Sequence, residues 1–157
     1  MAASITLKKV GKLIGKKTIL AGLSFGIEKG SLVAIVGLNG AGKTTLLKLL
    51  SGFENPNYGQ VFIHGLDMNK RRNETRKLVG YVPYENDLDP WLSLRENILF
   101  NAELYKVSTD IASKRIEKFS RLLDFRNQLD RTAHKVSGGI HKKTMIVRGL
   151  VHNPDIL

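Results

Sequence analysis

The sequence predicts an α/β fold whose central sheet is incomplete at the C-terminal end of the chain. Residues 32–37, LVAIVG, form a continuous apolar run rich in valine and isoleucine, which is typical of a strand buried on both faces of a sheet. The following GKTTLLKLLSG, residues 42–52, fits a helix that ends at Gly52. Residues 155–157 look like the start of another strand, so we expect more strands to follow Leu157.

Alternating apolar residues predict an antiparallel β-subdomain in the N-terminal part of the chain. One short apolar pattern opens near the N-terminus, and a second alternates with small or polar residues, as a half-buried strand does. A turn is expected at Lys29 and Gly30, and GQVFIHG, residues 59–65, predicts a strand between two glycines. The apolar positions of the first two strands are Ile5, Leu7, Val10, Leu23, Phe25 and Ile27.

The rest of the chain is predicted to be mainly helical. The charged residues 69–78 favour a helix, and residues 80–92 favour a brief strand that breaks into a loop at Pro83 and Pro90. Ser93 and Glu96 have the spacing of a capping box and predict a helix to about residue 105. A final helix is expected over about residues 138–151, stopped by Asn153-Pro154. Between them, Thr109 or Asp110 would cap a helix with a buried stripe of Ile111, Ile116, Phe119, Leu122 and Leu123.

Composition narrows the class of protein. The 157 residues are 42% apolar, which is enough for one domain with a core, and they include no cysteine, so thiolate metal sites and disulfides are excluded. The N-terminus lacks the apolar run of a secretory signal, and no stretch is apolar enough to span a bilayer. The net charge of +11 favours anionic partners. It is interpreted as a solubilising surface rather than a nucleic-acid footprint, because no aromatic-basic motif accompanies it, or as a charge balanced by acidic sequence outside these residues.

Residues 37–44 read GLNGAGKT and match the phosphate-loop pattern G-x-x-x-x-G-K-T. Glycines let the backbone N–H groups converge on phosphate oxygens, and the next helix points its positive end at the same charge. Lys43 should reach the β- and γ-phosphates, Thr44 should bind Mg²⁺, and Thr45 can add a phosphate contact. The alternative, an ordinary glycine-rich turn, is less favoured in this strand-to-helix context. The predicted ATP-binding residues are Gly37, Leu38, Asn39, Gly40, Ala41, Gly42, Lys43, Thr44 and Thr45.

A second glycine cluster, KVSGGIHKKT, begins at Lys135. Ser137 can cap a helix, while Gly138 and Gly139 permit a close approach to its backbone, and the helix dipole favours an anion there. Alone, this pattern fits a simple helix N-cap. Beside the phosphate loop, it favours a second nucleotide contact.

With both motifs in this order, the sequence resembles the ATP-binding subunits of ABC transporters over essentially its whole length. The match includes GLNGAGKTT, GQVFIHG, GYVP, SGG and VHNPDIL. The resemblance implies a P-loop NTPase core with a β-subdomain (residues 1–85), a mainly helical subdomain (86–137), and the signature helix with the next core strand (138–157), all in one ATP-binding domain (1–157). It also implies ATP and Mg²⁺ as ligands.

The resemblance also implies partners. Ser137, Gly138 and Gly139 would contact ATP held by the opposite subunit of a head-to-tail homodimer or heterodimer. Transmembrane transporter subunits would place the protein in the cytoplasm, peripheral on the inner face of the membrane; no sequence-specific nucleic acid is expected. Residues 69–77 and the loop around Trp91 are the candidate surfaces that meet them, and the two fit a solvated helix and a packed aromatic equally well. The apolar residue and three basic or potentially basic residues after SGG, residues 140–143, look like the export-type branch.

Three positions depart from the family pattern. Ile14 stands where an aromatic side chain usually stacks on adenine, so only a weak apolar contact is expected. Tyr84 replaces the glutamine of the coupling loop, and a phenol cannot offer both the acceptor and the donors of an amide. The catalytic Asp-Glu motif and the switch histidine are expected only beyond Leu157. No catalytic residue is therefore predicted here, neither Asp155 nor any of His64, His134, His141 and His152.

The sequence supports an energy-coupling ABC-type ATPase as the leading hypothesis, with hydrolysis expected in a longer, dimeric protein and not in this segment alone. One alternative is a non-catalytic nucleotide-binding or regulatory module, which the substitutions at Ile14 and Tyr84 favour. Another is a soluble ABC-type ATPase that acts on nucleic acid, which the charge favours but the single phosphate loop does not.

Overall fold

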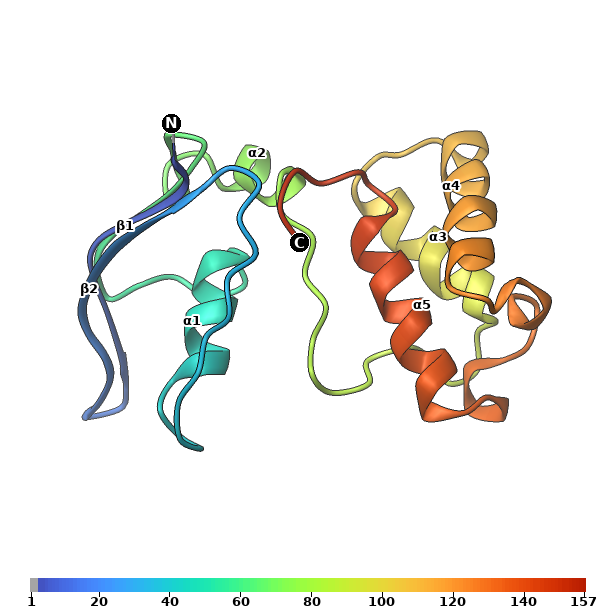
Figure 1. Cartoon of the computed structure of the whole chain (residues 1–157), viewed down its shortest axis with the longest axis horizontal. Helices are drawn as coiled ribbons and strands as arrows, with labels where there is room; N and C mark the ends of the chain where they lie inside the picture. The colour runs from blue at the N-terminus through green and yellow to red at the C-terminus, as the bar shows by residue number, and fades with distance from the viewer. Residues whose placement is uncertain (1–2) are drawn as a thin grey trace. The chain divides into compact units, whose positions relative to one another are not determined.

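The computed structural model describes residues 3–157, which form two compact units that divide between Val79 and Gly80. The first unit contains an antiparallel sheet and two helices, and the second contains three helices and two 3₁₀ turns (Figure 1). Across the described residues, none of the helices is both long enough and apolar enough to cross a membrane.

The sheet of the first unit confirms the predicted N-terminal β-subdomain. Strands β1 (Ala3–Ile14), β2 (Lys17–Glu28), β3 (Tyr58–Ile63) and β4 (Leu66–Asp67) lie in the order β2-β1-β3-β4, and every pairing is antiparallel. Val10 of β1 pairs with Leu23 of β2, and Leu7 pairs with Val61 of β3. The predicted turn follows β2 at residues 29–30. The apolar side chains of β1 therefore form the buried centre of this sheet.

Helix α1 (Lys43–Leu50) forms where the sequence predicts it and buries Leu46, Leu49 and Leu50. It ends at Gly52 as expected: Gly52 adopts a φ of +73°, and the N–H of Phe53 donates to the carbonyl of Lys48 at 2.9 Å. The charged segment 69–78 also contains a helix, α2 (Arg72–Lys77), which is shorter than the predicted range.

The prediction of a buried strand at residues 32–37 is wrong for this structure. The segment has no regular secondary structure, no residue in the described part of the chain pairs with it as a strand, and Leu32 and Val36 are exposed. An apolar run of this kind is buried only when neighbouring strands cover both sides and helices cover both faces. The four-stranded sheet is built from other residues and does not supply those neighbours.

The brief strand predicted after residue 79 is also not formed. Residues 80–83 make no strand, although the N–H of Gly80 donates to the carbonyl of Ile156 at 2.8 Å. This backbone contact lies in the segment where residues 155–157 were expected to begin a strand. It is too short to count as a strand of its own.

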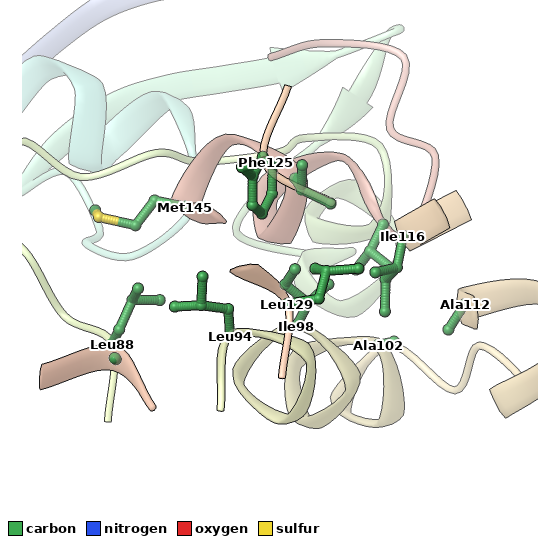
Figure 2. Packing of buried hydrophobic residues seen from close by; sticks show 12 residues of the cluster. Leu88, Leu94, Ile98, Ala102, Ala112, Ile116, Phe125, Leu129 and Met145 are labelled. Atoms are coloured by element: carbon green, nitrogen blue, oxygen red, sulfur yellow. The ribbon is translucent and has the colours of Figure 1, made fainter. Parts of the chain in front are cut away.

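The second unit packs helices α3 (Leu94–Leu104), α4 (Thr109–Leu122) and α5 (Gly138–Leu150) around one apolar core. The 3₁₀ turns η1 (Arg126–Gln128) and η2 (Ala133–Lys135) connect α4 to α5. Figure 2 shows the aromatic ring of Phe125 and the side chains of Ile98 and Leu129 in this core. The buried members are Leu88, Leu94, Ile98, Ala102, Ala112, Ile116, Phe125, Leu129, Ala133, Met145, Val147 and Val151.

The capping box predicted for α3 is present. The Ser93 hydroxyl accepts from the N–H of Glu96 at 3.1 Å, and the Glu96 carboxylate accepts from the N–H of Ser93 at 2.7 Å. The Ser93 bond lowers the pKa of Glu96. Helix α5 ends near the predicted point, where Asn153 adopts a φ of +59° and donates to the carbonyl of Leu150.

Two details predicted for α4 are wrong. Its N-cap is Ser108, one residue before Thr109, and the Ser108 side chain makes no capping bond. Ile116 is buried as predicted, but Ile111 and Leu122 are 47% and 70% exposed. The buried face follows Ala112, Ile116 and Ser120, four residues apart, and the predicted Phe119 and Leu123 are partly buried against the same core. The small side chains of Ala112 and Ser120 let α4 pack closely against the core, and a prediction from hydrophobicity alone does not find them.

Candidate functional site

The glycine-rich segment of residues 37–42 forms a tight loop that leads directly into α1. Gly40 and Gly42 have φ values of +81° and +89°, a region that side-chain-bearing residues rarely adopt, and the N–H of Ala41 donates to the carbonyl of Leu38 at 3.2 Å. Gly42 is the N-cap of α1, and no side chain caps this helix end. The loop is exposed, so its amides and the helix N-terminus are open to a ligand.

Lys43, the first residue of α1, turns back over this loop. Its ammonium donates to the carbonyls of Gly37 and Leu38 at 2.7 and 2.8 Å. The positive charge therefore lies at the loop, on the same side as the positive end of the α1 dipole, and the first turn of α1 contains no acidic residue. Thr44 is exposed and Thr45 is partly buried in the same turn.

These residues fit a phosphate ligand by chemistry and by shape. A helix N-terminus, glycine amides and a lysine ammonium all favour an anion, and none of them is neutralised by a carboxylate in the first turn. Mg²⁺ requires oxygen ligands and is commonly bound through one or two protein groups plus substrate phosphates. The Thr44 hydroxyl can be one such ligand. The described residues contain no cluster of three histidines or carboxylates that would hold a metal by itself.

Ile14 lies at the last position of β1, where it pairs with Lys17 across the hairpin turn. Its side chain is 58% exposed, so it can offer an apolar surface to a ligand. An isoleucine provides contact area without aromatic stacking.

The second predicted site lies at the N-terminus of α5 in the helical unit. Ser137 is the N-cap, and its hydroxyl accepts from the N–H of Ile140 at 3.5 Å. Gly138 and Gly139 are exposed, and a Cβ atom added to Gly138 would meet nothing within 4 Å. The first turn of α5 has no acidic residue. This helix end is also suited to an anion that approaches from outside the unit.

Tyr84 is 92% exposed, and its position is set from α5. The ammonium of Lys142 donates to the carbonyl of Pro83 at 2.7 Å and lies 5.9 Å from the centre of the Tyr84 ring. The neighbouring His141 contacts Asn86 and Ala133. Sequence reasoning treated the residues after Ser-Gly-Gly only as a basic run and missed these contacts. Their position in the first turn of a capped helix is the signal that could have drawn attention to them.

The four histidines lie apart from the phosphate loop or within the helical unit. His64 is an exposed turn residue, and His152 stacks on Tyr105 with ring centroids 3.9 Å apart. His134 Nδ1 donates to the Pro90 carbonyl at 2.8 Å, and its ring centroid lies 5.2 Å from that of Trp91. These contacts fit packing and surface roles.

Comparison with known families agrees with this arrangement of loop, sheet and capped helices. The family model described as ABC transporter matches residues 20–157, most of the chain. The chain belongs to this family.

Individual members of the ABC transporter family resemble the chain over nearly its whole length. The Nod factor export ATP-binding protein I of Burkholderia lata is 34% identical over 155 residues, 99% of this chain and 51% of the relative. The Fe(3+) ions import ATP-binding protein FbpC of Vibrio cholerae is 33% identical over 153 residues, 98% of this chain and 43% of the relative. The chain thus spans about half the length of the curated relatives it matches.

Solved structures show the same ABC fold. One, an ATP-binding subunit of an ABC transporter, has a TM-score of 0.84 and 27% identity, and the match covers 96% of this chain and 62% of that one. The dimeric structure of MJ0796, a bacterial ABC transporter cassette, also has a TM-score of 0.84, with 26% identity, and the match covers 96% of this chain and 70% of that one. These similarities confirm the predicted fold class, an α/β fold with an open sheet and a helical subdomain.

Proposed function

We propose that this chain binds MgATP as part of the energy-coupling subunit of an ABC transporter. The observation that carries the proposal is the loop of residues 37–42, where positive-φ glycines, the N-terminus of α1 and the Lys43 ammonium meet. Family membership supports ATP as the anion and Mg²⁺ as its usual companion.

Backbone amides and a few side chains share the binding of the nucleotide. The backbone amides of residues 37–45 bind phosphate oxygens, and Lys43 exchanges its contacts with the Gly37 and Leu38 carbonyls for the β- and γ-phosphates. The Thr44 hydroxyl would be a ligand to Mg²⁺, and the metal would supply neutralisation of phosphate charge. Ile14 contacts the base by apolar surface alone, so the triphosphate provides most of the affinity.

The N-terminus of α5 would complete a site on another copy of the protein. Ser137, Gly138 and Gly139 are exposed at a helix end that favours an anion, and a solved relative is described as dimeric. We therefore infer a head-to-tail dimer, either a homodimer or a heterodimer. We assign hydrolysis to the full-length dimer and no water-activating role to any residue of this chain.

The transport partners are inferred from the relatives. Both curated relatives are ATP-binding proteins of transport systems, one for export and one for import. We propose transmembrane subunits as partners, with the protein in the cytoplasm on the inner face of the membrane. The residues Ile140, His141, Lys142 and Lys143 favour the export-type branch, while the relatives include both directions.

Isothermal titration calorimetry with MgATP tests the proposal directly. Lys43→Ala should abolish measurable binding, because it removes the only side-chain cation of the loop. Lys48→Ala is the matched control: this lysine lies on the same helix but pairs with Glu54 at 3.8 Å, so binding should be unchanged. Equal affinity of Lys43→Ala and the unmodified protein would refute the phosphate assignment.

A further inference from the structure

The first turns of α5 are fastened to the loop of residues 83–87 within the helical unit. Lys142 supplies one contact: its ammonium donates to the carbonyl of Pro83 at 2.7 Å and to that of Tyr84 at 3.4 Å. The same ammonium lies 5.9 Å from the centre of the Tyr84 ring. One cation therefore holds both the backbone and the ring at this position.

His141 supplies a second contact, and the partners define its tautomer. Its Nε2 lies 2.5 Å from the carbonyl oxygen of Ala133, which can only accept, so Nε2 carries the proton. Its Nδ1 lies 2.9 Å from the amide nitrogen of Asn86, which can only donate, so Nδ1 accepts. The Asn86 orientation is consistent with this, because Asn86 Oδ1 accepts from the N–H of Leu88 at 3.4 Å. The contact requires neutral imidazole.

A third contact lies two turns further along α5. Arg148 donates to the carbonyl of Asp87 at 3.2 Å and forms an ion pair with the Asp87 carboxylate. The loop is thus held at three points by one helix. That helix begins with Ser137, Gly138 and Gly139.

We propose that His141 and Lys142 are positioning residues that hold Tyr84 and Asn86 in fixed register with the Ser137–Gly139 turn. The significance of that register rests on the proposed function, in which Ser137 contacts nucleotide, and on the resemblance that places Tyr84 at the coupling-loop position. Lys142 fixes the loop at every pH at which it is charged. His141 adds a pH-dependent part, because protonation places an N–H at Nδ1 against the N–H₂ group of Asn86. The amide then turns its Oδ1 toward this N–H and withdraws that oxygen from the N–H of Leu88.

Other charges near His141 must be separated from this effect. The charged or titratable side chains on the segments packed against it are Lys142, Lys143 and Arg148 on α5, Tyr84, Glu85 and Asp87 on the loop, and His134 and Lys135 on η2. Asp87 is paired with Arg148, and Lys143 donates to the Asp124 carbonyl at 3.4 Å. His134 is the other histidine on these segments, and it bonds to the Pro90 carbonyl instead. It therefore provides the natural control.

Backbone amide exchange in the full-length protein without nucleotide tests the proposal. The reporter is the N–H of Leu88, measured by NMR from about pH 5 to 8 and corrected for intrinsic rates. In the unmodified protein its exchange should become roughly fivefold faster at the acidic end, as expected for loss of one hydrogen bond. His141→Gln should remove this pH dependence, because a glutamine amide offers both a donor and an acceptor at every pH. His134→Gln should leave it unchanged.

Lys142 is tested in the same experiment at neutral pH. Lys142→Met should speed exchange of the loop amides, and Lys142→Arg should restore protection. The proposal would be overturned if exchange of the amides of residues 84–87 were unaffected by Lys142→Met, or if the pH dependence survived in His141→Gln. If Lys142→Met does not fold, as judged by exchange of α3 and α4, the comparison of the unmodified protein with His141→Gln decides.

Calorimetry on the same samples keeps this inference separate from the proposed function. The phosphate loop is intact in all these variants, so MgATP affinity should remain unchanged. Absence of MgATP binding in the unmodified protein would refute the proposed function and leave the loop contacts standing. If MgATP binding is normal and neither His141→Gln nor Lys142→Met changes exchange of the loop amides, only the positioning role is refuted.

Discussion

Gly42 lies so close to Leu20 that a Cβ atom at Gly42 would stand 2.9 Å from the Leu20 Cδ2 atom. The same Cβ atom would lie 3.2 Å from the carbonyl oxygen of Ile19. The N-cap of α1 is therefore packed against β2, and this contact determines where the phosphate loop lies relative to the sheet of its own unit.

Gly42→Ala should weaken MgATP binding strongly. The substitution combines a steric clash with a backbone φ of +89°, which costs about 1–2 kcal/mol for a residue with a side chain. Gly30→Ala is the control, since Gly30 has a φ of +78° but open space around it. Calorimetry should show reduced affinity only for Gly42→Ala; equal affinities would mean that the packing against β2 does not shape the loop.

Ile14→Tyr should increase affinity for ATP but not for inorganic tripolyphosphate. An aromatic ring at the exposed end of β1 can stack on a base, and base–aromatic stacking contributes about 1–3 kcal/mol. The comparison of the two ligands isolates the base. Ile111→Tyr, at another exposed isoleucine on α4, is the control and should change neither affinity. A gain for both ligands would contradict a base contact at Ile14.

Ser137→Arg should leave MgATP binding intact in the full-length protein while preventing dimer formation and turnover. The arginine would add bulk and charge at the exposed N-terminus of α5 without touching the phosphate loop. Ser108→Arg makes the same change at the N-cap of α4 and should be tolerated. Sedimentation velocity and phosphate release measure the two effects. Dimerisation by Ser137→Arg at the level of the unmodified protein would show that the signature interpretation is wrong.

Glu117→Gln should lower thermal stability at neutral pH and lose that effect in acid. Its hydrogen bond from Arg126, at 2.5 Å, together with the bond from Arg95, lowers the pKa of the Glu117 carboxyl. A lowered pKa in the folded state gives stability that is present above the unfolded value of about 4.3 and lost as the pH falls below it. Melting curves of the two proteins should therefore converge below about pH 4. A constant difference across pH would contradict the ionic origin.

Local features of this chain were predictable because they depend on neighbouring residues. The capping box of Ser93 and Glu96, the end of α1 at Gly52 and the cap at Ser137 each follow from side chains within a few positions. The antiparallel strands were predictable from alternation for the same reason. The phosphate-loop geometry around Gly40 and Gly42 also follows directly from the sequence pattern.

Features that depend on distant packing were not predictable. The apolar run containing Leu32 and Val36 has the composition of a buried strand, but burial needs neighbouring strands that no local pattern can guarantee. The predicted α4 stripe is confirmed for Ile116 but not for Ile111 and Leu122, because the small residues Ala112 and Ser120 occupy the buried face in their place. The contacts of His141 with Asn86 and Ala133 join separate segments, and only the folded structure brings them together.

The pairing of Trp91 with His134 gives the molecule a built-in optical reporter. Trp91 is the only tryptophan in the sequence, and its ring centroid lies 5.2 Å from that of His134. The emission of this single indole therefore reports on the packing of one contact, between the loop before α3 and the η2 turn. The chain also has no cysteine, so a single introduced thiol can carry an acceptor dye without competing labels. Energy transfer from Trp91 to such a dye can then measure the distance between the helical unit and the labelled position, with no second tryptophan or native thiol to interfere.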